Sequence, residues 1–200
     1  MPTNRSDNSC ANFDNGLIAI FSGVFSGVIT NDLWIFNTLT LTWSLSHATN
    51  APLPMYAYCA VTLPDGNILY IGGYSHINSI LVYTSMNNLP LYNTTSNTWE
   101  NMSILGPLPP FRADFPAVLS MVFNKSLNVL SIKRIIIFGG RSFGTTFGDL
   151  WIVNTTKFWW SYGNISNPIV DLTLAGHTAT LVDNYMFVSF GKSFNYPYAI

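Results

Sequence analysis

Charged residues are scarce in this sequence, and their scarcity excludes several functions. They make up 8% of the 200 residues, against about 25% in an average soluble domain. The net charge is −1 and lysine and arginine form no run, so we expect no binding of nucleic acid or anionic lipid. Hydrophobic residues make up 48% and aromatic residues 15%, which argues against disorder and suits short strands with uncharged turns.

Cysteine and histidine are also scarce. Cys10 and Cys59 are too few for a disulfide framework or a cysteine-rich zinc site. We expect Cys59, inside an apolar run, to be a buried thiol and Cys10 to be a loose one near the terminus. His47, His76 and His177 lie in different parts of the chain with no matched spacing. The sequence therefore predicts no metal site and no cofactor.

Motifs for catalysis are absent as well. The chain has no G-x-S-x-G nucleophile elbow and no G-x-x-x-x-G-K-[ST] phosphate loop. Asp32, Glu100 and Asp149 are scattered singly, so nothing supports a pair of catalytic carboxylates. Asp32 and Asp149 recur at equivalent positions, which indicates a role in a turn or at the start of a strand. We predict that the chain is not an enzyme.

No signal peptide or membrane-spanning segment is predicted. Residues 1–16 are polar, and the apolar stretch 17–30 is interrupted by Ser-Gly at 22–23 and 26–27. That stretch is shorter than the roughly 20 apolar residues that a span needs. Six N-x-[ST] sequons occur, at Asn4, Asn93, Asn101, Asn124, Asn154 and Asn164. The compartment stays open between the cytoplasm and an extracellular fragment.

What the sequence does contain is a repeated unit, clearest at 134–160. An apolar run ends at Gly139-Gly140, a polar loop follows, a second apolar run begins at Asp149, and Trp160 closes the unit. The glycine that ends the first run recurs at positions 23, 73, 140 and 191, with spacings of 50, 67 and 51. A period near 50 residues with four short strands in each unit is typical of a β-propeller.

One hairpin and one loop are predicted inside the second unit. The Asp65-Gly66 turn between the apolar runs 56–63 and 68–71 is a strong hairpin signal. The later apolar run at 80–83 we interpret as a packed loop rather than an additional strand.

These residues resemble the kelch repeat, in which a hydrophobic strand is followed by Gly-Gly and, further on, by an aromatic residue and a tryptophan. The resemblance covers about residues 17–192. Within that range the sequence is similar to the kelch and galactose-oxidase-like repeats of fungal proteins. It is carried by Gly72, Gly73, Gly139, Gly140, Trp43, Trp99 and Trp160. The glycines permit positive φ, and the tryptophans would fill the space between neighbouring blades, so we interpret both as structural.

The resemblance implies an all-β, kelch-type propeller that is partial, with about three and a half to four four-stranded blades. We expect a polar tail at 1–16, the propeller at 17–192 and a second tail at 193–200. The expected blades are about 17–50, 51–105, 106–165 and an incomplete 166–192. We expect the first unit to lack its first strand and the last unit its final two. An open edge of this kind favours self-association.

The function that the resemblance implies is a non-catalytic module that presents loops to a protein partner. The candidate loops are 23–31, 74–88 and 141–148, and within the last we single out Arg141, Phe143 and Phe147, a cationic and aromatic mixture typical of interfaces. Two alternatives stay open. One is a galactose-oxidase-like or glycan-active secreted enzyme fragment, and the other is an ectodomain fragment of a longer receptor-like protein.

Overall fold

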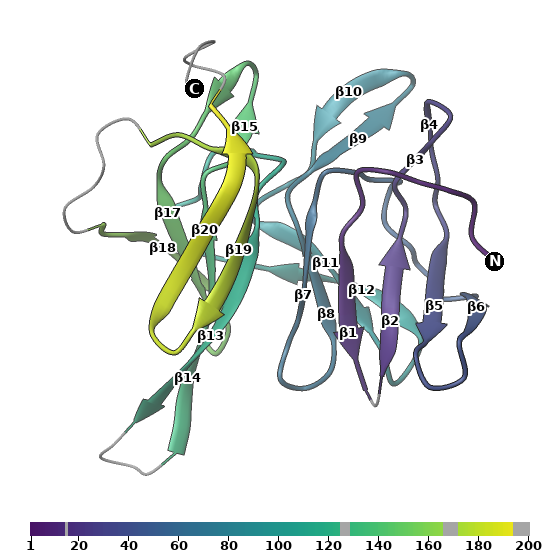
Figure 1. Ribbon diagram of the computed structural model, residues 1–200, viewed down its shortest axis with the longest axis horizontal. Helices are drawn as coiled ribbons and strands as arrows, with labels where there is room; N and C mark the ends of the chain where they lie inside the picture. The colour runs from purple at the N-terminus through teal and green to yellow at the C-terminus, as the bar shows by residue number, and fades with distance from the viewer. Residues whose placement is uncertain (15, 125–128, 166–171, 194–200) are drawn as a thin grey trace. The chain divides into compact units, whose positions relative to one another are not determined.

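The described residues form an all-β fold. The computed structural model describes residues 1–14, 16–124, 129–165 and 172–193, without the side chains at 121–132. The chain divides into two compact units, 1–102 and 103–200 (Figure 1). Most of the expected tail 193–200 lies outside the described residues, as do residues 125–128 and 166–171. No helix in the described part has the length and hydropathy that a bilayer crossing needs.

The first unit contains two four-stranded antiparallel sheets. Along the sheet the first has the order β1-β2-β5-β6 and the second β7-β8-β11-β12. The strands of the first sheet are β1 (Cys10–Phe13), β2 (Leu17–Phe21), β5 (Leu33–Asn37) and β6 (Thr42–Ser46). Those of the second are β7 (Cys59–Thr62), β8 (Ile68–Ile71), β11 (Asn88–Asn93) and β12 (Thr98–Ser103).

The second unit contains a third four-stranded sheet and, in its described residues, a two-stranded one. The third sheet has the order β13-β14-β17-β18, and the fourth pairs β19 with β20. The strands of the third sheet are β13 (Ala117–Asn124), β14 (Val129–Phe138), β17 (Leu150–Asn154) and β18 (Trp159–Gly163). Those of the fourth are β19 (Ala175–Val182) and β20 (Tyr185–Lys192).

In each four-stranded sheet the strands lie side by side in the order in which they follow one another in the chain. Repeated antiparallel sheets of this kind are the blades of a partial β-propeller. The predicted fold class is confirmed.

The prediction of a polar tail at 1–16 is wrong for its last part, which contains a strand. Residues Cys10–Phe13 form β1, which pairs with β2 from Cys10↔Ile20 to Phe13↔Leu17, so the first sheet has its first strand. The run CANF is only four residues long and shows no strict alternation of apolar and polar side chains, and only Ala11 in it is buried. Its place in the sheet is decided by pairing with β2, which the hydrophobic pattern does not reveal.

Each four-stranded sheet carries a short two-stranded ribbon between its second and third strands. The first ribbon is β3 (Val24–Phe25) with β4 (Val28–Ile29), the second is β9 (Tyr74–Ile77) with β10 (Ile80–Tyr83), and the third is β15 (Arg141–Ser142) with β16 (Thr145–Thr146). The prediction that 80–83 is a packed loop is therefore wrong, because these residues form β10 and pair with β9.

The paired glycines allow the chain to pass close to the segment that precedes each sheet. A Cβ at Gly73 would lie 2.6 Å from the carbonyl oxygen of Tyr56, and one at Gly140 would lie 2.9 Å from that of Ala113. Both glycines also have positive φ, at 96° and 93°. The second position of the pair therefore requires glycine, because backbone atoms block any side chain there.

The turns between third and fourth strands share one cap. The side-chain oxygen of Asn154 accepts hydrogen bonds from the N–H groups of Thr156 and Lys157, both at 3.0 Å. Asn37 and Asn93 make the same pair of bonds in their own turns. Turn chemistry thus accounts for the asparagines of the sequons at Asn93 and Asn154.

The core of the first unit lies between its two sheets. Trp99 on β12 contacts Phe21 of β2, with ring centroids 4.6 Å apart, and Tyr70 of β8 at 5.0 Å. These rings belong to a buried cluster that draws residues from both sheets. Trp99 therefore fills the space between neighbouring blades, as the repeat logic predicts.

Candidate functional site

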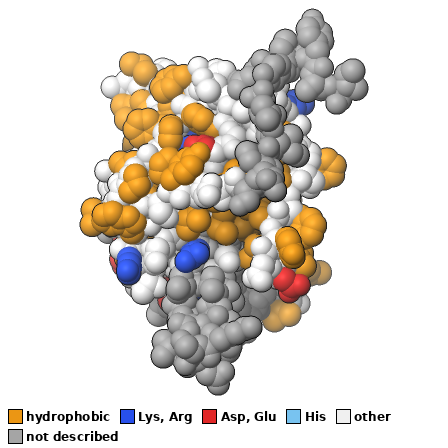
Figure 2. Space-filling view, turned by 90° about the vertical axis from the view of Figure 1, so that its left-hand side faces the viewer, with side chains coloured by type: hydrophobic (Ala, Val, Ile, Leu, Met, Phe, Trp, Pro, Cys, Tyr) orange, Lys and Arg blue, Asp and Glu red, His pale blue; other side chains and the backbone are white. Residues whose placement is uncertain are grey.

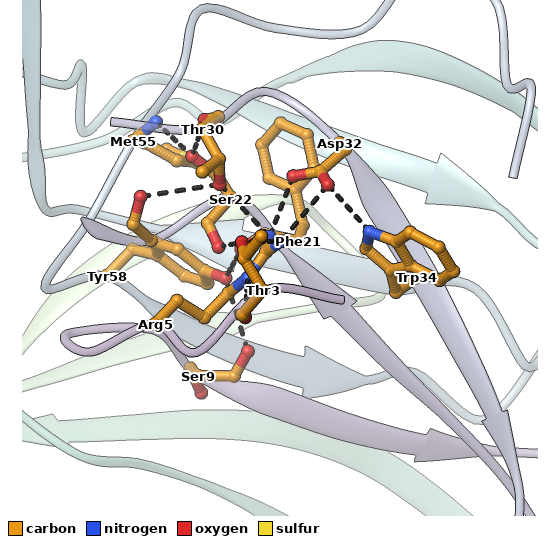
Figure 3. A network of polar contacts seen from close by, with 11 residues as sticks. Thr3, Arg5, Ser9, Phe21, Ser22, Thr30, Asp32, Trp34, Met55 and Tyr58 are labelled. Atoms are coloured by element: carbon orange, nitrogen blue, oxygen red, sulfur yellow. Dashed lines mark hydrogen bonds and ion pairs between the residues drawn. The ribbon is translucent and has the colours of Figure 1, made fainter. Parts of the chain in front are cut away.

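The base of the first ribbon is held by a network around Arg5 (Figure 3). The Arg5 guanidinium donates from two nitrogens to the carboxylate of Asp32, at 2.7 and 3.0 Å. It also donates to the carbonyl oxygen of Ser22 at 3.1 Å and to the Thr30 hydroxyl at 3.0 Å. Arg5 thus ties the segment before the sheet to both ends of the ribbon and to the start of β5.

Arg112 makes the same network in the third sheet. Its guanidinium donates to both oxygens of Asp149, at 2.7 and 3.0 Å, and to the carbonyl oxygen of Gly139 at 2.9 Å. The guanidinium also lies 4.5 Å from the centre of the Phe147 ring, which is within cation–π range. Arg112 is fully buried.

Each carboxylate is held further by an indole. Trp34 donates to Asp32 at 2.6 Å, and Trp151 donates to Asp149 at 2.7 Å. The recurrence of Asp32 and Asp149 is therefore explained by an Arg–Asp–Trp network, and the expected role at the start of a strand is only part of it.

These contacts lower the pKa of both carboxyl groups. The hydrogen bond from Arg5 lowers the pKa of Asp32 to about 2, and the Trp34 indole acts in the same direction, while burial opposes them. Burial raises the pKa of Asp149, but the hydrogen bonds and charge of Arg112 outweigh it and leave the pKa below its usual value. Both groups are ionised near pH 7 and engaged in structural contacts, so neither is suited to proton transfer.

The second sheet replaces this network with apolar packing. In the second sheet Tyr92 pairs with Ile68 and Leu91 with Leu69. Continuing this register along the two strands places Asn88 at the position that Asp32 and Asp149 have in their own sheets. The position of Arg5 and Arg112 is taken by Met55, which is buried beside Ser22 and accepts a hydrogen bond at its carbonyl from Gly23. The loss of the arginine thus coincides with the loss of the aspartate.

Above these bases, the ribbons expose apolar side chains. Val28 on the first ribbon is 66% exposed, Ile80 on the second is 67% exposed, and Phe143 on the third is 82% exposed. Phe25, Ile77 and Leu81 are further exposed ribbon residues. In Figure 1 the first and second ribbons project from the same end of the first unit. No charged residue lies on these two ribbons.

The third ribbon holds the residues singled out from the sequence, in three different environments. Phe143 is at the exposed tip. Arg141 forms an ion pair with Asp114 at 2.5 Å and is about half exposed. Phe147 lies against Arg112 at the base. The ribbon therefore does not bring the three side chains together on one surface.

A cavity of about 260 Å³ opens beside the third ribbon. It is lined by Asp114, Arg141, Ala175, Gly176, Gly191 and Lys192. Beside the second ribbon, Tyr56 stands at the position that Ala113 has beside the third, and its ring lies 5.3 Å from that of Tyr74. The base of the third ribbon is open and polar where that of the second is filled by aromatic rings.

Outside the ribbons, charged groups are few. On the face shown in Figure 2, hydrophobic side chains gather in patches while charged ones are few and scattered. Among the described residues, no group of three or more histidine, cysteine or acidic side chains is placed to hold a metal ion.

The histidines and cysteines are separately placed. His47 and His76 are exposed, whereas His177 is buried on β19 with its ring edge-on to Phe138 at a centroid distance of 5.7 Å. Burial lowers the pKa of His177, so it is neutral near pH 7. Cys59 is buried, as predicted; Cys10 is exposed, but it lies in β1 and is not in a loose terminal segment.

Sequence reasoning missed the arginines, and it named the loops 23–31 and 74–88 as candidates without singling out the residues at their tips. A signal for the first was available: Gly23 to Asp32 and Gly140 to Asp149 are both nine residues apart, and one arginine precedes each pair. The ribbon tips gave only two-residue strands or the short apolar run 80–83, which pattern alone does not separate from a packed loop.

The blades, glycine pairs and ribbons define a kelch-type repeat domain. The family model described as the KLHDC2/KLHL20/DRC7 Kelch-repeats domain matches residues 1–130. The chain therefore belongs to the kelch-repeat family, whose domains are generally non-enzymatic modules that bind proteins.

The chain is similar to several longer proteins. It is 25% identical over 186 residues to acyl-CoA-binding domain-containing protein 4 of Arabidopsis thaliana, covering 90% of this chain and 25% of that protein. It is 28% identical over 149 residues to Kelch domain-containing protein 10 of Rattus norvegicus, covering 73% and 34%. A Kelch repeat-containing protein of Arthroderma benhamiae is 24% identical over 140 residues, covering 64% and 20%. The chain thus spans a fifth to a third of the length of these relatives.

Proposed function

We propose that this chain is a non-catalytic interaction module that binds a protein partner through its ribbon tips. The observation that carries the proposal is the repetition of one device: three ribbons, each between the second and third strands of its sheet, each with an exposed apolar tip. Large exposed apolar side chains on an ordered support are typical of the energetic centres of protein interfaces.

The bases of the ribbons support this role. Arg5 and Arg112 fix the two ends of their ribbons by hydrogen bonds to backbone carbonyls and to Asp32 and Asp149. In the second ribbon Tyr74 packs against Tyr83 at 4.7 Å and against Tyr56. A tip on a fixed base loses little conformational entropy on binding, which favours affinity.

The three residues that we singled out from the sequence, Arg141, Phe143 and Phe147, have different roles in this proposal. Phe143 is the contact residue at the third tip, and Arg141 contributes a half-exposed charge beside it. Phe147 acts through Arg112, as a support for the base.

The test compares the partner affinity of variants substituted at the ribbon tips with that of a variant substituted at the opposite end of a sheet. Partners captured by crosslinking from cell extracts are identified by mass spectrometry, and the purified partner is titrated against Ile80→Asp, Phe143→Asp and Arg141→Ala variants. We expect a loss of at least about ten-fold in affinity for one or both tip aspartates, because a charge would enter a desolvated contact. Arg141→Ala should change affinity less, since its charge is already paired.

The matched control is Leu39→Asp. Leu39 is 77% exposed in the turn between β5 and β6, at the end of the sheet away from the ribbon. The control should bind like the unsubstituted chain. Partner affinity unchanged by both tip aspartates, or equally weakened by Leu39→Asp, contradicts the proposal.

A further inference from the structure

His177 is a buried polar side chain without a hydrogen-bond partner. The residue is 6% exposed, and neither Nδ1 nor Nε2 of its ring makes a hydrogen bond. Within β19 the only other buried residue is Ala175. Buried polar atoms are nearly always paired in folded proteins, because an unpaired one loses its contacts with water and gains nothing in return. His177 is therefore a weak point in the packing of β19.

The His177 ring lies at the joint between the third and fourth sheets. It meets the Phe138 ring edge-on at a centroid distance of 5.7 Å, and a Cβ at Gly139 would lie 2.9 Å from its Cε1. The neighbouring Gly176 N–H donates to the carbonyl oxygen of Asp114 at 2.8 Å. In Figure 1 β19 lies beside β13. The side chain that packs β19 onto the third sheet is thus an ionisable one.

The second and third sheets have other side chains at the position of His177. In each of these three sheets one residue lies against the glycine that ends the second strand, and the pairs are Tyr58 with Gly73, Phe115 with Gly140, and His177 with Gly191. Tyr58 donates its hydroxyl to the carbonyl oxygen of Phe21, and Phe115 has no polar side-chain atom. Among these three residues, His177 alone is polar and unpaired.

No carboxylate of the described elements around His177 is placed to neutralise a protonated ring. Asp149 is held by Arg112, and Asp114 by Arg141. Asp183 lies in the turn of the hairpin, six positions further along the chain, which is roughly 20 Å along a strand. The remaining charged residues of the elements packed against His177 are cations, namely Lys133, Arg134 and Lys192.

These surroundings favour the neutral imidazole. Burial lowers the pKa of His177 below its usual value of 6.5, and the backbone of Phe138 opposes this only in part, without a hydrogen bond of acceptable geometry. When β19 moves away from the third sheet, the ring becomes hydrated and regains its ordinary pKa. The open form therefore takes up a proton first as the pH falls, and it gains in free energy relative to the closed form below about pH 6.5.

We propose that His177 makes the joint between the third and fourth sheets sensitive to pH, so that the hairpin of β19 and β20 opens from the third sheet more often as the medium becomes acidic. The third sheet keeps its own ion pair under these conditions, because Arg112 holds the pKa of Asp149 below its usual range. This inference is independent of the ribbon proposal, since it concerns a joint between sheets and no partner.

The test measures amide hydrogen exchange of the chain of residues 1–200 at pH 7.5 and pH 5.5. Rates corrected for the intrinsic exchange at each pH give the opening equilibrium of β19. We expect that equilibrium to rise several-fold at pH 5.5, up to about ten-fold, because this pH is one unit below the ordinary pKa of histidine. The amides of β17 in the third sheet should show no such rise.

Two variants assign the effect to one side chain. His177→Phe copies Phe115 of the third sheet and cannot take up a proton, so the opening of β19 should no longer depend on pH. His47→Gln is the matched control, because His47 is exposed, and it should respond like the unsubstituted chain. A rise below two-fold, an equal rise in His177→Phe, or an equal rise in β17 overturns the proposal.

A second measurement decides even if His177→Phe does not fold. The ring protons of His177 are followed by nuclear magnetic resonance in the unsubstituted chain between pH 8 and pH 5. We expect the His177 midpoint to lie below the ordinary value of about 6.5. A midpoint at or above that value overturns the proposal, because protonation would then not favour the open form.

Discussion

Arg112 and Asp149 form a two-point ion pair, with nitrogen–oxygen distances of 2.7 and 3.0 Å, in which the arginine side chain is fully buried. The pair Arg5–Asp32 repeats it in the first sheet with the same two distances. The second sheet has Met55 and Asn88 in these places. In this chain, two sheets thus have an ion pair at these two positions, and one sheet has two uncharged residues there.

Removing one member of the pair should be costly. We expect Arg112→Ala to lower the free energy of unfolding by about 3–5 kcal/mol, because it leaves a partly buried carboxylate without its cation. Urea unfolding followed by tryptophan fluorescence near pH 7 measures the change. The exposed pair gives the control: Arg141→Ala should cost less than about 1 kcal/mol.

Replacing both members together should restore most of that loss. The double variant Arg112→Met with Asp149→Asn copies the residues of the second sheet, so no charge is left unpaired. We expect its urea midpoint to lie well above that of Arg112→Ala. A double variant as unstable as the single one would show that the two solutions are not interchangeable.

Acid should destabilise the first unit through Asp32. Its pKa is about 2 in the folded chain and about 3.9 in an unfolded one, so the unfolded state takes up the proton first as the pH falls. The contribution of Asp32 is present above about pH 4 and is lost as the pH falls to about 2. Urea midpoints between pH 5 and pH 2 should fall less steeply in Asp32→Asn. An identical slope in both proteins contradicts this assignment.

The two glycines of the third ribbon should respond differently to alanine. Both have positive φ, 93° at Gly140 and 79° at Gly144, which costs about 1–2 kcal/mol for a residue with a Cβ. Only at Gly140 would that Cβ also meet a backbone oxygen, at 2.9 Å, while nothing lies within 4 Å at Gly144. We expect Gly140→Ala to cost about 3 kcal/mol or more in urea unfolding. Equal costs would mean that the close approach is relieved by a backbone shift.

Truncating Trp99 should open the core between the first two sheets. Trp99 is buried against Phe21 and Tyr70, so Trp99→Ala should cost about 3–5 kcal/mol. Trp43 is half-buried and packs on Phe36 at 4.7 Å, so Trp43→Ala should cost clearly less. Thermal unfolding of the two variants, monitored by circular dichroism, ranks them; the reverse order would contradict the packing role of Trp99.

The repeat could be predicted because short sequence motifs mark each unit. Glycine pairs, the Asp65-Gly66 turn and regularly spaced tryptophans mark each blade, and the family resemblance follows from them. The strand Cys10–Phe13 could not, because it has little hydrophobic pattern and is held by pairing with β2. The sequence points to Phe147 as a contact residue because it shows the type of this residue but not its neighbour Arg112.

The sequence alone determined the class of fold, since alternating apolar strands and obligatory glycines allow few other arrangements. It also leads us to expect no function that depends on clustered charges or metal ligands, because the required residues are few. Only the tertiary structure decided which residues act together. Arg112 and Asp149 are 37 positions apart, and pairing across that separation depends on how the strands lie in space. The same holds for the three ribbon tips, which exist only once the sheets have formed.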